Sequence, residues 1–77
     1  MPIVYMEIEA KDKETIGKII QTRRKSRKIV QVDLADIAGI SPRTLRDIEK
    51  GIANPELETL MRICKVLGIQ IKLEVIK

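Results

Sequence analysis

Residues 31–50 read QVDLADIAGISPRTLRDIEK, a stretch with the pattern of two short helices joined by a tight turn. Small and apolar side chains occupy the positions that would face inward, and polar and basic residues fill the positions left facing outward. The inward-facing residues are Leu34, Ala35, Ala38, Ile40, Leu45 and Ile48. Gly39 stands where the chain has to bend between the two helices.

The residues around the turn fit a helix that starts close behind the first. Ser41 is a good N-cap, Pro42 suits the first helical turn, and Gly51 is a usual C-terminal stop. The stretch therefore predicts helices over about 31–38 and 42–50. Two short helices connected in this way form a helix-turn-helix pattern, which makes double-stranded DNA the first candidate partner.

One further helix is predicted on each side of this pair. Asp12 can cap a helix over about 13–26, and Gly17 inside that helix indicates close packing against a neighbouring helix. An Asn-Pro turn precedes a helix over about 56–67, which has one apolar face. That face, which we expect to be buried, consists of Leu57, Leu60, Met61, Cys64 and Leu67.

The C-terminal residues change from the helical period to strict alternation. The apolar residues Ile69, Ile71, Leu73 and Val75 point to one side, which predicts a half-buried strand over about 69–76. A shorter strand is predicted over about 3–9. Because strand backbone groups need partners, we expect both strands to join a small sheet across the two-fold axis of a homodimer. The alternative is a frayed tail whose isoleucines pack on the last helix.

The composition indicates a single domain, 1–77, and excludes several classes of protein. The chain has one cysteine and no histidine, so neither a disulfide framework nor a zinc or other metal site is expected. A phosphate-binding glycine loop and a paired acid and base are also missing, which argues against an enzyme or a cofactor. No apolar run approaches the ~20 residues of a membrane span, and no secretory signal begins the chain. We therefore expect a cytoplasmic location.

Positive charge is concentrated in the middle of the chain. Residues 18–50 carry nine basic and four acidic side chains, whereas residues 1–14 carry two basic and four acidic ones. The run RRKSRK at 23–28 lies just before the helix pair, and we expect its Arg27 and Lys28 to contact phosphates. The alternative for this run is a solvated helix end.

Residues 16–68 resemble the Cro/C1-type (XRE-like) helix-turn-helix domain. The residues that carry the resemblance are Ile16-Gly17, Arg24, Gln31, Leu34-Ala35, Ala38-Gly39-Ile40-Ser41, Thr44-Leu45, Ile48-Glu49 and Gly51. Asn54-Pro55, Leu57, Thr59-Leu60 and Leu67-Gly68-Ile69 extend it. The resemblance implies a mainly α fold, a four-helix lambda-repressor-like domain, to which the two predicted strands would be added.

The resemblance also implies that the helix over 42–50 lies in the major groove of DNA. The side chains expected to face base edges are Pro42, Arg43, Arg46 and Asp47. Arg43 is the strongest candidate, because arginine bonds guanine O6 and N7 in bidentate fashion. Asp47 can accept from a cytosine amino group or orient Arg43 one turn away. Arg46 is long enough to reach phosphate as well.

Other residues receive supporting roles from the same resemblance. Gln31, Thr44 and Lys50 are expected to contact phosphates, with a solvated surface as the alternative. Val30 stands where the family usually has a serine or threonine cap, so that capping bond is expected to be missing. Arg24 and Glu49 are expected to pair and to hold the first helix against the third.

The C-terminal strand makes the architecture similar to that of HipB-type antitoxins. This likeness implies a dimer that represses its own operon from a palindromic operator and holds a HipA-like kinase toxin inactive. One alternative is a stand-alone autoregulator of the XRE type without a toxin partner. A second is a protein-interaction module that keeps the fold and has lost DNA binding.

Overall fold

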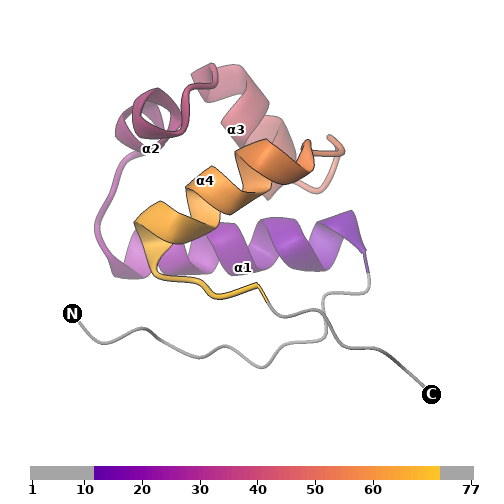
Figure 1. The fold of residues 1–77 in the computed structure, drawn as a ribbon, viewed down its shortest axis with the longest axis horizontal. Helices are drawn as coiled ribbons and strands as arrows, with labels where there is room; N and C mark the ends of the chain where they lie inside the picture. Colours follow the sequence, from indigo (N-terminus) through magenta and orange to yellow (C-terminus); the bar gives the residue numbers. More distant parts are fainter. Residues whose placement is uncertain (1–11, 72–77) are drawn as a thin grey trace.

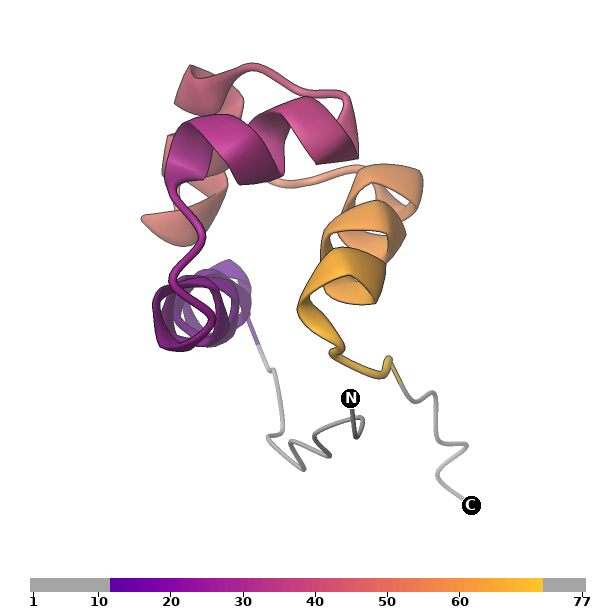
Figure 2. The ribbon, with the colours of Figure 1, turned by 90° about the vertical axis from the view of Figure 1, so that its left-hand side faces the viewer.

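The computed structural model describes residues 12–71, and most of this range is helical. The helices are α1 (Lys13–Ser26), α2 (Gln31–Ala38), α3 (Pro42–Glu49) and α4 (Leu57–Leu67). Figures 1 and 2 show α2 and α3 lying across α1 and α4. α1 and α2 each contact both α3 and α4. The prediction of a mainly α, four-helix domain is confirmed, and each bound lies within one residue of the predicted one.

Two of the four helices begin with a side-chain cap. The Asp12 carboxylate accepts a hydrogen bond from the backbone N–H of Thr15 at 2.8 Å, and this bond lowers the pKa of Asp12. Ser41 Oγ accepts from the backbone N–H of Thr44 at 3.1 Å, with Pro42 in the first turn. The predicted absence of a cap at Val30 is also observed, since its side chain makes no capping bond.

All four helices end in a Schellman motif, in which a residue with positive φ is followed by an isoleucine. After α4, the N–H of Ile69 donates to the Cys64 carbonyl at 2.8 Å, and Gly68 has a φ of +68°. The four residue pairs are Lys28-Ile29, Gly39-Ile40, Gly51-Ile52 and Gly68-Ile69. Lys28, with a φ of +56°, is the one residue of these four pairs that has a positive φ without being glycine.

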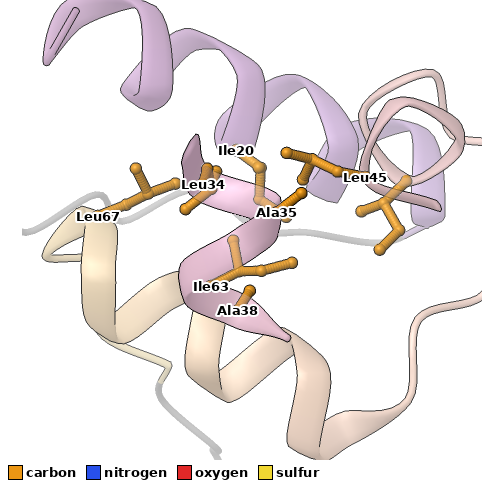
Figure 3. Close-up of a cluster of buried hydrophobic side chains, with 8 residues drawn as sticks. Ile20, Leu34, Ala35, Ala38, Leu45, Ile63 and Leu67 are labelled. Carbon is orange, nitrogen blue, oxygen red and sulfur yellow. The ribbon is translucent and has the colours of Figure 1, made fainter. Parts of the chain in front are cut away.

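The hydrophobic core lies where the four helices meet, and Figure 3 shows its side chains pointing toward one another. Its fully buried members are Ile20, Leu34, Ala35, Ala38, Leu45, Ile48, Ile63 and Leu67. Three of the isoleucines that follow the helices, Ile29, Ile40 and Ile69, pack against this core. The same residue therefore closes each of these helices and extends the core.

Gly17 permits the close approach of α1 to α3 that the sequence predicts. A Cβ placed on Gly17 would stand 2.4 Å from the Ile48 carbonyl oxygen and 2.7 Å from that of Glu49. Both are backbone atoms, which cannot rotate away as a side chain would. Any larger residue at this position would force the C-terminal end of α3 away from α1.

The predicted buried face of α4 is partly wrong. Leu57 and Met61 are 67% and 56% exposed, while Thr59 and Ile63 are buried beside Cys64 and Leu67. α4 packs against both α1 and α2, so its buried arc centres on Ile63 and Leu67. The apolar residues of α4 are regularly spaced, but this spacing does not determine which of them face α1 and α2.

The predicted strands fall mainly outside the described residues. The range 3–9 lies wholly outside them, as do Leu73 and Val75. Within residues 12–71 no strand is present, and Ile69 makes only an isolated β-bridge. Ile69 instead completes the end of α4, and Ile71 is 42% exposed. The C-terminal strand and the dimer sheet therefore remain a prediction.

Residues 12–71 contain neither a helix that could span a membrane nor a cluster of side chains that could bind a metal ion. None of the four helices is long and apolar enough to cross a membrane. In the same range, no group of three or more His, Cys, Asp or Glu side chains could hold a metal ion.

Candidate nucleic-acid interface

The outward face of α3 is polar and basic, whereas its inward face is buried. Leu45, Ile48 and Glu49 point into the molecule. Most of the side chains predicted to contact bases or phosphates are exposed on this helix or directly after it: Pro42, Arg43, Thr44, Arg46 and Lys50. One short helix and the residue directly after it therefore present two arginines and a lysine to solvent.

The structure separates the roles of individual residues on this face. Thr44 Oγ1 lies 2.8 Å from Ser41 Oγ, so its hydroxyl already takes part in the cap of the helix. Asp47 is half-buried, and its carbonyl oxygen accepts from the backbone N–H groups of Ile52 and Ala53. Arg43 and Asp47, both described, form no ion pair with each other. The Arg43 guanidinium is therefore not held by the carboxylate one turn away.

Arg24 and Glu49 form a buried, bidentate ion pair between α1 and α3. Arg24 Nε donates to Glu49 Oε2 at 2.7 Å, and Nη2 donates to Oε1 at 3.0 Å. The third nitrogen of the guanidinium, Nη1, donates to the Ile29 carbonyl at 2.8 Å. Because the pair is desolvated, its stabilising effect depends on these additional hydrogen bonds.

Gln31 joins this ion pair, a contact that the sequence does not reveal. Its Nε2 donates to Glu49 Oε1 at 3.1 Å, across 18 residues of chain. An amide nitrogen carries two hydrogens, so one remains available for an acceptor outside the molecule. Gln31, in the first turn of α2, is thus held by Glu49, the residue that also ties α3 to α1.

The basic run at 23–28 divides into arginines that lie against other parts of the molecule and lysines that face solvent. Arg23 Nε donates to the Leu67 carbonyl at 2.7 Å, at the end of α4. Arg27 Nη1 lies 3.4 Å from the point where a Cβ on Gly68 would stand. Lys25 and Lys28 are exposed. The sequence gives no signal for this division, because a basic residue near a helix end has the same pattern in both cases.

An open groove of about 430 Å³ lies beside α3. Its lining is Gly39, Ile40, Thr44, Ile48, Ala53, Asn54, Pro55, Glu56, Thr59 and Arg62. This lining contains neither a cysteine nor a histidine.

Cys64 is buried elsewhere in α4, and burial raises the pKa of its thiol to about 11. The thiol is therefore protonated at neutral pH and unsuited to act as a nucleophile.

Comparisons with known proteins agree with this arrangement. A family described as helix-turn-helix matches residues 20–73. The chain is 46% identical over 57 residues to the "Immunity repressor protein" of Bacillus phage phi105, covering 74% of this chain and 40% of the relative. It is 33% identical over 57 residues to "Multiprotein-bridging factor 1" of Debaryomyces hansenii, covering 74% of this chain and 38% of the relative.

The fold is similar to that of the clp gene regulator ClgR from Corynebacterium glutamicum. The TM-score is 0.72 at 26% identity, over 74% of this chain and 61% of that one. The chain spans about two fifths of the length of the phage repressor and of the bridging factor. Since the family match covers more than half of the sequence, the chain belongs to the helix-turn-helix family of the Cro/C1 (XRE-like) type.

Proposed function

We propose that this protein is a sequence-specific, DNA-binding transcriptional repressor. The observation that carries the proposal is the outward face of α3, which presents Arg43, Arg46 and Lys50 while the opposite face anchors the helix. Buried residues hold the helix in place, so its exposed side chains can enter the major groove without a change in the fold. The phage relative, named an immunity repressor, supports the same function.

Arg43 of α3 is assigned to base reading and Gln31 of α2 to phosphate. Arg43 is exposed in the first turn of α3 and makes no ion pair with Asp47. Gln31 keeps one amide hydrogen for a phosphate at the N-terminus of α2, where the backbone N–H groups also favour an anion. Lys28 and Lys50 are exposed and supply further positive charge.

We further propose that the protein acts as a homodimer on a palindromic operator. One α3 covers a single half-site, and paired recognition helices about 34 Å apart read two half-sites in successive turns of DNA. The alternating residues 69–76 support a subunit interface made by the C-terminal segment. Such a repressor would act in the cytoplasm and would not be an enzyme.

Selection of bound duplexes from a random DNA pool tests the proposal. The wild-type protein should enrich an inverted repeat. Arg43→Ala should lose about 1–3 kcal/mol of base discrimination in each half-site and retain its fold. Lys18→Ala, which removes an exposed positive charge from α1, is the matched control and should enrich the wild-type sequence. Unchanged preference in the Arg43 variant would refute its role, and no enrichment by the wild type would refute the function.

A protein-bridging role is a second candidate, and the bridging-factor relative favours it. In that case the chain would bind a protein through this domain, and the basic face of α3 would be incidental. The same selection separates the two functions, because a bridging module would enrich no sequence.

We propose, more specifically, that this repressor is the antitoxin of a HipAB-like toxin-antitoxin pair. This proposal is supported by the alternating C-terminal segment, the feature that resembles HipB-type antitoxins. It would be supported by a neighbouring gene that encodes a kinase-like protein, if that protein copurifies with this chain. A chain that represses its own operon with no such neighbour would be a stand-alone autoregulator.

A further inference from the structure

The C-terminal end of α4 is bonded by Arg23 of α1 and lies beside Arg27, the residue that follows α1. Arg23 Nε donates to the carbonyl of Leu67 at 2.7 Å, although 44 residues separate the two in the chain. The last carbonyls of a helix have no intrahelical partner, and a nearby cation also suits the negative end of the helix dipole. The bond is partly buried, which limits competition from water.

The same arginines lie over the residue at which the chain leaves α4. Arg23 Nη2 and Arg27 Nη1 stand 3.5 and 3.4 Å from the point that a Cβ on Gly68 would occupy. Gly68 has a φ of +68°, and Ile69 is tied back to the Cys64 carbonyl and packs against the core. The chain therefore leaves α4 with Ile69 packed on the core and two guanidinium groups beside Gly68.

From this geometry we propose that Arg23 and Arg27 are positioning residues for the second subunit. They set the course of the C-terminal segment as it leaves α4, and thereby the distance between the two α3 helices of the dimer. This inference rests on the dimer proposed above. It assigns Arg27 a role other than the phosphate contact expected from the sequence.

Arg23→Met tests the inference, because methionine keeps much of the apolar stem and removes the donor. Half-site affinity should stay at the wild-type value, since α3 is untouched. Affinity for the full operator should fall about tenfold, a loss of about 1.4 kcal/mol, because the two α3 helices would no longer match the spacing of the half-sites. The wild type should bind operators with one base pair added or removed between the half-sites more weakly than the correct operator. For Arg23→Met, this difference in affinity should be smaller.

Two further variants make the experiment decisive. Lys18→Met removes an exposed charge from the same helix and should behave as the wild type in every assay. Arg27→Met provides a second test if Arg23→Met does not fold, because Arg27 lies beside Gly68 and does not carry the bond to the Leu67 carbonyl. Folding of each variant is followed by circular dichroism at the temperature of the binding assays.

Three outcomes would overturn the inference. Equal proportional losses at half-site and full operator, with a reduced salt dependence, would show that the arginines bind phosphate. A lower melting temperature with an unchanged spacing profile would show that they only stabilise the fold. A wild-type chain that sediments as a monomer and still selects a DNA sequence would remove the dimer while leaving DNA recognition intact.

Discussion

Glu49 accepts hydrogen bonds from side chains of two other helices, Arg24 of α1 and Gln31 of α2. It is also buried, so Arg24 is the cation that balances its charge, and Gln31 adds a neutral hydrogen bond. A single carboxylate thereby links all three helices around the candidate DNA-binding surface. The resemblance to the Cro/C1 domain predicts the pair with Arg24, whereas the bond from Gln31 depends on a three-dimensional approach that no local pattern encodes.

Glu49→Ala should destabilise the protein by about 3–5 kcal/mol, because it leaves the Arg24 charge buried without a partner. Urea unfolding followed by circular dichroism measures the change. The double variant Arg24→Met/Glu49→Leu removes both charges and should recover much of the loss. If the double variant is as unstable as Glu49→Ala, an unpaired charge is not the cause of the instability.

The candidate site is predictable from the sequence where exposure alone matters. Pro42, Arg43 and Arg46 are expected on the outward face of α3, and all are exposed. The sequence is less informative where a side chain chooses between solvent and a distant partner. Arg23 illustrates this limit, because its partner carbonyl at Leu67 is brought close only by the packing of α1 on α4.

At the scale of single elements, the helix ends were the most predictable feature. Glycine followed by isoleucine occurs after α2, α3 and α4, and the geometry is the same each time. Glycine has no Cβ penalty at positive φ, and the isoleucine adds an apolar contact. The buried face of α4 was harder to predict, because its apolar arc is wider than the contact surface that α1 and α2 provide.

Lys28→Gly should stabilise the protein by about 0.5–1 kcal/mol. Lys28 has a φ of +56°, a conformation that costs about 1–2 kcal/mol for a residue with a Cβ, partly offset by the greater freedom of glycine when unfolded. Thermal unfolding measures the gain. Lys25→Gly, which removes an equivalent exposed lysine from inside α1, should instead cost about 1 kcal/mol. A destabilised Lys28 variant would show that its side chain contributes more than its backbone costs.

At the scale of the whole molecule, Ile69 is the last residue within the described range that packs on the core. Ile69 packs on the core and closes α4, whereas Gln70 and Ile71 are exposed. The fold can therefore be tested separately from the proposed dimer. A strand expected from alternation alone needs a partner strand to form, and a single chain's pattern does not say where that partner is.

Deletion of residues 70–77 should give a folded monomer. Its helical content should match that of the full chain, and its affinity for a full operator should fall toward that for one half-site. Sedimentation measures the mass, and binding to operators with one or two half-sites measures the loss. The shortened chain ends at Ile69, because removing that residue as well would also open the end of α4. A shortened chain that still sediments as a dimer would refute an interface in this segment.

The close contact of Gly17 with the end of α3 has a consequence for the partner as well. A buried ion pair holds α3 against α1, and two carbonyls of α3 lie so close to Gly17 that no side chain fits between them, so α3 has little freedom to tilt or slide. In the complex that we propose, the duplex would therefore have to bend or twist to fit. Its affinity should then vary with the flexibility of base pairs that the protein never touches.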